Sequence, residues 1–346
     1  MNNIENFQYP SPEQKYKVLV RCYTFNHSKF IEDALNGFAM QQTNFPFVCL
    51  VVDDASTDGE QEVIKKWMER ECEMSKAETI DIPTSIVILV PHKSNVSCTF
   101  AFYLLKQNLY KVKGAKKKHV DPWRERCEYE ALCEGDDYWI DPLKLQKQAD
   151  FLDKNFEYSA ISSQSQMVYS SELTSKLFSR ELKNRDYQIK EIIGSRPFHT
   201  ATILYRNMNV LRERPSVFSG DALLFSSLSV LGKIHYSSKV TGIYRKHSMG
   251  ASSTCRLEQL KHDFNMIAYL KRLDPKYPVN KLKSYLYYTL ARGPKDVTCK
   301  EKILYSLKSI YYSFSYFPRN LLFICRLIYG VFIYKTFILN RDKKSR

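Results

Sequence analysis

Three carboxylates, Glu134, Asp136 and Asp137, lie within four residues of one another, directly after the apolar residues 131–133. Acids this close repel one another unless a cation joins them. Carboxylate oxygens at the end of a strand bind divalent cations and accept hydrogen bonds from the hydroxyl groups of a sugar. The pattern therefore indicates a site for a metal ion together with a nucleotide.

A second acidic pair, Asp53-Asp54, follows the apolar run at residues 47–52. These acids can hydrogen-bond the ribose and base of a nucleotide. The alternative is a solvated turn at a strand end, because Asp58-Gly59 nearby is itself a turn signal. A phospho-acceptor receiver domain also has such acids, but its single small sheet explains neither the acids near residue 136 nor the length of the chain.

The elements that would position these acids alternate between strands and helices. Strands are expected at residues 17–25, 47–52 and 85–90, and the helices between and after them include one at 99–110. This alternation predicts a parallel sheet with right-handed crossovers. Ligands of such sheets bind beyond the carboxyl ends of the strands, which is where both acidic clusters fall.

The second half of the chain continues the pattern. We expect strands at 160–169, 200–205 and 233–244, a helix at 221–231, and basic helical structure from residue 257 onward. The sequence at 111–126 is expected to be a solvated basic loop, because it is rich in lysine and arginine, namely Lys111, Lys113, Lys116, Lys117, Lys118, Arg124 and Arg126.

Composition limits the classes of protein. The chain has 346 residues, 44% of them hydrophobic, which is enough for one large α/β domain with an appendage. Its formal net charge of +15 favours an anionic partner: nucleic acid, a phospholipid surface or a phosphorylated substrate. No helix-turn-helix, zinc or RNA-recognition signature supports nucleic-acid binding. The nine cysteines form no C-x-x-C pair, and the polar N-terminus is unlike a signal peptide, so we expect reduced cysteines in a cytosol.

Five short motifs follow one another in an order that is more specific than any one of them. They are Val20-Arg21-Cys22-Tyr23-Thr24-Phe25-Asn26-His27, Val52-Asp53-Asp54-Ala55-Ser56-Thr57-Asp58-Gly59, Glu134-Gly135-Asp136-Asp137-Tyr138-Trp139-Ile140-Asp141-Pro142, Phe198-His199-Thr200-Ala201-Thr202, and Gly220-Asp221 with Tyr244-Arg245-Lys246-His247-Ser248. In this order they resemble the family 2 glycosyltransferases, and a bacterial surface-glycan subgroup in particular. The resemblance covers roughly residues 15–250. It implies a GT-A fold, which is a Rossmann-like mixed, mainly parallel sheet flanked by helices.

The resemblance also implies roles for individual residues. The donor nucleotide would contact Thr24, Phe25, Asn26, Asp53, Asp54 and Asp136. The cofactor Mg²⁺ or Mn²⁺ would be bound by Asp137, with Asp136. Asp221 would be the catalytic base of an inverting displacement. Contacts with the diphosphate or the acceptor would come from Arg245, His247, His199, Glu134 and Trp139.

Some of these roles have simpler alternatives. Asp221 can merely cap the helix that it begins, and the family often has a bulky residue or a second acid where Ala222 stands here. His199 and His247 can be hydrogen-bonded residues of the core or rim, and Trp139 can be part of the core.

The C-terminal residues 321–339 are nearly all apolar or aromatic and are followed by a basic end, with Arg326 and Lys335 inside the run. This length is just enough to span a bilayer, which takes about 20 residues. A helix lying in the membrane interface suits the basic residues better, and packing against the protein is a further alternative.

The sequence therefore predicts a tail at 1–14, a GT-A domain at 15–255, a helical extension at 256–317 and a membrane-associating tail at 318–346. The predicted activity is metal-dependent, inverting transfer of a sugar from a nucleotide-diphosphate donor to a glycan or lipid-linked acceptor in surface polysaccharide biosynthesis. The expected place is the cytoplasm, at the inner face of the cell membrane, without nucleic acid as a partner. The alternative function is non-catalytic binding of a sugar nucleotide or glycan by the same fold.

Overall fold

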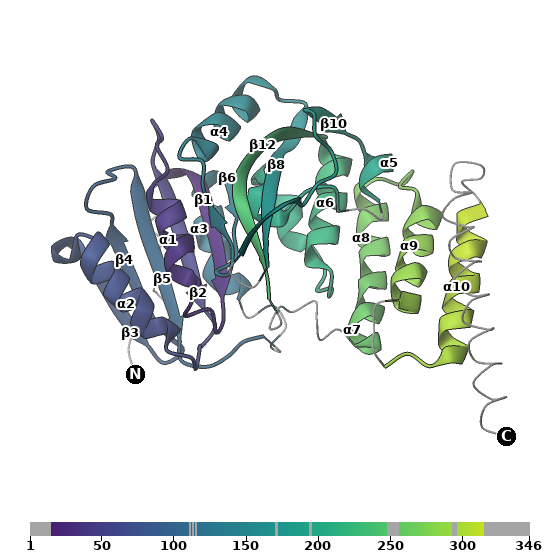
Figure 1. Cartoon of the computed structure of the whole chain (residues 1–346), viewed down its shortest axis with the longest axis horizontal. Helices are drawn as coiled ribbons and strands as arrows, with labels where there is room; N and C mark the ends of the chain where they lie inside the picture. Colours follow the sequence, from purple (N-terminus) through teal and green to yellow (C-terminus); the bar gives the residue numbers. More distant parts are fainter. Residues whose placement is uncertain are drawn as a thin grey trace. The chain divides into compact units, whose positions relative to one another are not determined.

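The computed structural model describes residues 15–110, 112, 114, 116–169, 172–193, 196–247, 256–292 and 296–314 (Figure 1). The chain forms two compact units. The first contains residues 1–187, 197–213 and 231–247, and the second contains 188–196, 214–230 and 248–346. The predicted tails at 1–14 and 318–346 lie outside the described residues.

The first unit is built on one mixed sheet of twelve strands. Its order is β10-β12-β8-β11-β6-β1-β2-β5-β4-β3, with β7 paired to β12 and β9 paired to β8. The strands are β1 (Tyr16–Thr24), β2 (Phe47–Asp53), β3 (Glu78–Ile82), β4 (Ser85–Pro91), β5 (Cys98–Leu105), β6 (Cys127–Leu132), β7 (Tyr138–Trp139), β8 (Tyr158–Tyr169), β9 (Glu172–Leu177), β10 (Arg185–Tyr187), β11 (Leu204–Arg206) and β12 (Lys233–Lys246). Strands β6, β1, β2 and β5 run parallel to one another, which confirms the predicted mainly parallel α/β sheet.

Helices cover both faces of this parallel core (Figure 1). One face packs against α1 (Ile31–Ala39), α2 (Glu60–Glu71) and α4 (Lys144–Lys154). The other face packs against α3 (Lys117–Arg124). Alternate residues of a strand point to opposite faces, and in β2 every residue is buried. The continuous apolar run of this strand is therefore explained by burial on both sides.

One predicted helix is wrong. Residues 98–105 form strand β5, parallel to β2, where a helix at 99–110 was expected, and β4 beside it runs antiparallel. Phe100 and Phe102 face one layer of helices, while Ala101 and Tyr103 face the other. A run that is apolar on both faces has no visible period of two, so the sequence pattern did not separate a buried strand from a helix.

The predicted solvated basic loop is also partly wrong. Residues 117–124 within it form α3, and this helix buries Val120, Trp123 and Arg124. The Trp123 indole donates a hydrogen bond to the Tyr103 hydroxyl at 3.1 Å, which holds the helix to the sheet. The helix was not predicted because the exposed Lys117 and Lys118 give this segment the composition of a solvated loop.

The second unit is helical where it is described. It contains α5 (Ile189–Ile192), α6 (Gly220–Leu231), α7 (Leu257–Lys261), α8 (Met266–Leu273), α9 (Val279–Arg292) and α10 (Cys299–Ser313), apart from the last residue of α6, which belongs to the first unit. This confirms the predicted C-terminal helices. Among the residues that are described, no helix has both the length and the apolar character needed to cross a membrane.

A buried ion network crosses the centre of the sheet. Glu130 on β6 accepts hydrogen bonds from Arg21 on β1 at 2.6 Å and from Arg124 on α3 at 2.8 and 3.0 Å. Burial alone would raise the pKa of Glu130, but Arg124 and Arg21 together hold it well below its usual range. This carboxylate therefore joins two strands and the helix that covers them.

We predict that Glu130→Gln lowers the free energy of unfolding by about 3–5 kcal/mol at pH 7, because it leaves two buried guanidinium groups without their counter-charge. The pKa of this group is depressed in the folded state. Its stabilisation is therefore complete above the unfolded pKa of about 4.3 and is lost as the pH falls further. Urea unfolding of both proteins from pH 7 to pH 3 measures the difference, which should shrink below about pH 4.

The matched control is Glu128→Gln on the same strand. Glu128 is mostly exposed, and its ion pair with Lys17, at 4.0 Å, is long. This change should cost no more than about 1 kcal/mol. Equal effects of the two substitutions would contradict the role given to Glu130.

Candidate functional site

The turn between β6 and β7 carries the acidic cluster and lies at the carboxyl end of the parallel strands. Its backbone is hydrogen-bonded to the neighbouring strand β1, with the Cys133 N–H donating to the Arg21 carbonyl at 3.2 Å and the Gly135 N–H donating to the Tyr23 carbonyl at 3.1 Å. The turn thus extends the sheet pairing beyond the end of β6 and brings the acids over the end of β1.

Gly135 makes this close approach possible. A Cβ atom at this position would lie 2.1 Å from Thr24 Oγ1 and 2.6 Å from Thr24 Cβ. No side chain fits there without moving the turn away from β1. The glycine therefore determines how near Asp136 comes to the residues that follow β1.

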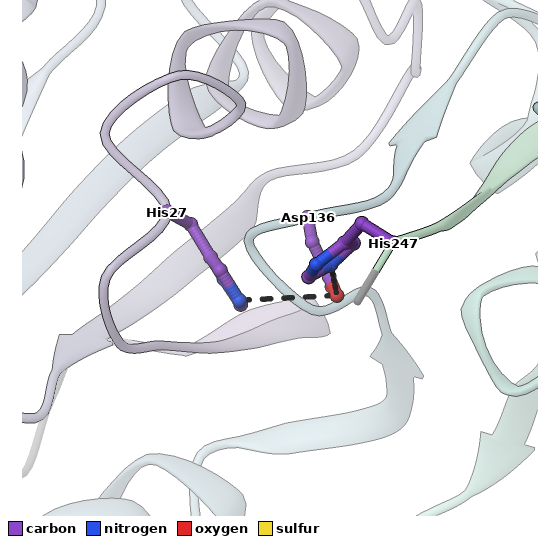
Figure 2. Close-up of side chains that lie close together, drawn as sticks. All are labelled: His27, Asp136 and His247. Atoms are coloured by element: carbon purple, nitrogen blue, oxygen red, sulfur yellow. Dashed lines mark hydrogen bonds and ion pairs between the residues drawn. The ribbon is translucent and has the colours of Figure 1, made fainter. Parts of the chain in front are cut away.

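Asp136 lies between two histidines from distant parts of the chain (Figure 2). Its Oδ2 is 3.0 Å from His247 Nε2 and 3.8 Å from His27 Nε2. His27 belongs to the loop after β1, and His247 comes directly after β12. One ligand atom of each residue lies within 4.8 Å of the others, so the three can hold a metal ion together.

The hydrogen bonds of His27 support that use. The Thr24 hydroxyl donates its proton to the Glu60 carboxylate, so towards His27 Nδ1, 3.2 Å away, it can only accept. We assign the ring proton to Nδ1 on this basis, which leaves a lone pair on Nε2. Burial lowers the pKa of His27, which favours the neutral ring. Its Nε2 and the Asp136 carboxylate are then two electron-pair donors that face each other, and a cation completes such an arrangement.

Asp137 is buried beside this group. Its Oδ1 accepts the backbone N–H of Arg245 at 2.9 Å, and its Oδ2 lies 3.4 Å from His199 Nε2. Burial, and then the charge of Asp136, raise the pKa of Asp137 well above its usual range. The described group of ligand atoms includes Asp136 and does not include Asp137, whose metal-binding role stays a prediction.

Arg245 connects the acidic turn to its surroundings. Beside the backbone contact with Asp137, its guanidinium donates to the Asp136 carbonyl at 3.2 Å and to the carboxylate of Asp33 on α1. The same group lies 4.3 Å from the ring centre of Tyr138. The predicted contact of Arg245 with a diphosphate is untested, and in the structure this residue binds the turn that carries the acids.

The first acidic pair is also buried, at the end of β2, whereas the turn residues 57–59 that follow it are exposed. Asp54 accepts the Leu109 N–H at 2.7 Å and pairs with Lys116 Nζ at 2.7 Å. Asp53 Oδ1 accepts the Ser56 N–H at 3.1 Å, whereas its Oδ2 is buried without a hydrogen-bond partner in the part of the chain that is described. Asp53 therefore keeps one unused acceptor.

The three residues predicted at the end of β1 differ in how available they are. The Thr24 side chain is buried and is engaged with Glu60. Asn26 has a left-handed backbone with φ of 57°, and its Oδ1 accepts the Thr57 N–H at 2.8 Å. Phe25 is 43% exposed and is therefore the one that presents a side-chain surface to a ligand.

Trp139 and the lysine behind it are part of the core. The Trp139 indole donates to the Ala201 carbonyl at 2.6 Å, and Lys144 Nζ lies 4.1 Å from the centre of the indole ring. Burial lowers the pKa of Lys144 to about 7. His199 packs 4.3 Å from Tyr244 on the neighbouring strand. These contacts place Trp139 and His199 as walls behind the acidic turn.

Asp221 belongs to the second unit, in the first turn of α6. One carboxylate oxygen accepts the Ala222 N–H at 2.8 Å, and the other pairs with Arg196 at 2.8 Å. Asp263 binds the residues before this helix instead, because it accepts the Phe218 N–H at 2.7 Å and the Ser219 hydroxyl at 2.6 Å. Asp263 therefore holds the residues before α6. The start of this helix does not depend on Asp221 alone.

Several residues of this description, among them His27, Glu60, Arg196 and Asp263, were not predicted as site residues from the sequence. His27 is the last residue of the first quoted motif and Glu60 directly follows the second, and a histidine within a nucleotide motif is a usable signal. Arg196 and Asp263 had none, because an ion pair or a cap between segments far apart in sequence leaves no local pattern.

Comparison with known protein families finds no family model that matches the chain. Curated relatives include the uncharacterized protein Rv1520 of Mycobacterium tuberculosis and the uncharacterized protein Mb1547 of Mycobacterium bovis. Each is 28% identical over 228 residues, which cover 66% of this chain and 58% of the relative. The chain thus spans little more than half the length of these curated relatives.

Among solved structures, the chain resembles TarS 1–349 of S. aureus, determined in complex with UDP, with a TM-score of 0.52 and 17% identity. That match covers 89% of this chain and 83% of the other. A longer structure of S. aureus TarS gives a TM-score of 0.53 and 17% identity, over 86% of this chain and 49% of the other. At such identities the likeness is one of fold, and it agrees with the GT-A fold class that the motifs predicted.

Proposed function

We propose that this protein is a metal-dependent, inverting glycosyltransferase that takes its sugar from a nucleoside-diphosphate donor. The observation that carries the proposal is the position of Asp136 between His27 and His247, at the carboxyl end of the parallel strands. Ligands of α/β sheets bind at this edge. The UDP complex of the structural neighbour TarS supports the choice of a nucleotide ligand.

The chemistry of the three side chains fits a divalent cation. Two imidazole nitrogens and one carboxylate oxygen suit a transition ion such as Mn²⁺ better than Mg²⁺, which prefers oxygen ligands. The second acid, Asp137, adds negative charge next to the group. A bound cation would supply positive charge for the diphosphate as it leaves the sugar.

The nucleoside would use the first acidic pair. Asp53 Oδ2 has no partner among the described residues and would accept a hydrogen bond from a ribose hydroxyl if the donor reaches this buried atom. Phe25 offers an exposed ring that can pack on a base. We propose these contacts for the nucleoside. Asp54 would also contact the donor nucleotide, as predicted, and Lys116 would then have to move away from the Asp54 carboxylate.

The proposed base is Asp221. It would take the proton of the acceptor hydroxyl while that oxygen forms a bond to the anomeric carbon and the bond from that carbon to the diphosphate breaks. A single displacement of this kind inverts the configuration of the sugar. Arg196, 2.8 Å from Asp221, would orient the carboxylate before the acceptor arrives.

The acceptor and the location complete the proposal. The acceptor would be a glycan or a lipid-linked glycan of surface polysaccharide synthesis, met at the inner face of the cell membrane. The competing function is a binding protein with the same fold that performs no transfer. A turnover assay on the unmodified protein separates the two, because a binding protein would take up the donor and release no product.

For the donor site, we predict that Asp136→Ala abolishes Mn²⁺-dependent binding of nucleoside diphosphates. The change removes the one carboxylate that both histidines face. Thermal unfolding with UDP or GDP, with and without Mn²⁺, measures this, since a ligand held at 100 times its Kd adds about 2.7 kcal/mol of apparent stability.

The control for this experiment is Asp81→Ala, an exposed acid on β3 that pairs with Lys106. It should keep the full Mn²⁺-dependent shift. A normal shift in Asp136→Ala would show that the cation and its nucleotide bind elsewhere.

For the proposed base, we predict that Asp221→Asn lowers the transfer rate by about 10²–10⁴-fold while donor binding stays unchanged. Asparagine has nearly the shape of aspartate and is an equally good helix cap, so a loss of this size reports on proton transfer and not on α6. Full transfer activity in Asp221→Asn would move the base to another residue. The readouts are initial transfer rates and donor-dependent thermal shifts of the same samples.

A further inference from the structure

Helix α10 buries small polar residues and exposes large apolar ones, which is the reverse of what a surface helix of a soluble domain usually does. The side that packs into the second unit buries the small polar residues Ser306, Ser309 and Ser313. Large apolar side chains point outward, and their exposure ranges from 37% for Ile303 to 72% for Tyr311. The set comprises Ile303, Leu304, Leu307 and Tyr311 with Phe314, the residue directly after the helix, and we call it the outer face of α10. An ordinary amphipathic helix would place these residues inside.

The serine side explains how such a helix can still pack tightly. Ser284 on α9 donates to the Ser309 carbonyl at 2.9 Å, and Ser309 donates to the Ser284 carbonyl at 2.7 Å. Small residues bring two helix backbones close together and bond across the contact, as they do between helices in membranes, where apolar side chains are needed elsewhere. Tyr305 and Tyr312 of α10 also stack on Tyr287 of α9, with ring centres 6.2 and 5.7 Å apart, whereas the large side chains of the outer face remain exposed.

The residues of the outer face recur at the spacing of one helical side, from 303 and 304 through 307 and 311 to 314. Lys300 at the start of this side and Lys308 beside it are exposed as well. A continuous apolar side flanked by lysines marks a binding surface in a soluble protein. It has the form of a helix that lies in the plane of a membrane interface.

We propose that the outer face of α10 binds an anionic phospholipid surface, with its apolar side chains among the acyl chains and its lysines at the headgroups. Charge favours this partner, because the protein carries a net charge of +15. Tyrosine is also a preferred residue at the level of the headgroups. Beyond Phe314 the sequence continues into the apolar run 321–339 and the basic residues Arg341, Lys343, Lys344 and Arg346, which suit the same environment.

This inference extends the proposed location at a membrane and does not depend on glycosyl transfer. Its test measures lipid binding alone, so its failure would leave the proposed enzyme activity standing. The other occupants of the same face are a second copy of the chain and the chain's own C-terminal segment, and the experiment distinguishes both from a bilayer.

The first measurement is flotation of the full-length protein with vesicles of equal parts phosphatidylglycerol and phosphatidylcholine. The double variant Leu307→Ser/Tyr311→Ser should bind at least about tenfold more weakly than the unmodified protein, equivalent to about 1.4 kcal/mol. Both side chains are exposed, so the variant should fold normally. The matched control Val96→Ser/Phe156→Ser removes two other exposed apolar side chains, from the first unit, and should bind as the unmodified protein does.

The second measurement places a probe on the helix. The three native tryptophans, Trp67, Trp123 and Trp139, are buried, so a tryptophan introduced by Leu307→Trp should be quenched selectively by brominated phospholipids. Phe156→Trp should not be quenched. Unquenched fluorescence at position 307 together with unchanged flotation of the double variant would overturn the proposal and assign lipid binding, if present, to the C-terminal segment. Loss of a dimer in the double variant, without lipid binding by either protein, would assign the outer face to a second copy and also overturn it.

Discussion

Arg245 makes the interactions on which the arrangement of the site in the first unit depends. Its backbone N–H binds the Asp137 carboxylate, and its guanidinium binds the Asp136 carbonyl and Asp33. These contacts join the end of β12, the turn after β6 and helix α1, three segments far apart in the sequence. His247, two residues after Arg245, comes next to Asp136 because of this attachment. Without it, the buried carboxylate of Asp137 would lose a hydrogen bond and a nearby positive charge while Asp136 beside it repels it.

Other buried carboxylates of the first unit are also paired with a positively charged side chain. Glu130 is paired with two arginines beneath the sheet, and Asp54 is paired with Lys116 at its edge. In each case a buried carboxylate is balanced by a cation from another element. The carboxylate of Asp136 differs, because the side chains that face it are the imidazoles of His27 and His247, which can bind a cation together with it. This difference is the physical reason for placing the cation site at Asp136 and not at the other acids.

The sequence predicted the core of the fold because its signals are local. The runs predicted as strands at 17–25 and 47–52 became β1 and β2, and the segments predicted at 221–231 and 233–244 became α6 and β12 with nearly the same ends. Strand β5 was taken for a helix because burial on both faces removes the alternation that marks a strand. Helix α3 was missed because its lysines dominate the composition of that segment. The acids of the site were found by their clustering, but the partners that define their roles were found only in part. His247 was named as a diphosphate or acceptor contact. The bond from Thr24 to Glu60, which leaves Thr24 as the acceptor for His27, and the pairing of Arg196 with Asp221 depend on tertiary contacts that no local pattern records.

The central claim is that Asp136, His27 and His247 hold one cation together with a nucleoside diphosphate. The most direct measurement is pulsed electron paramagnetic resonance of Mn²⁺ bound to the protein in the presence of UDP or GDP. The account predicts magnetic coupling of Mn²⁺ to imidazole nitrogens of two histidines and to phosphorus of the nucleotide, with one nitrogen coupling lost in His247→Ala. Coupling to phosphorus without any nitrogen coupling would contradict it, since the cation would then be bound by carboxylates and phosphate alone.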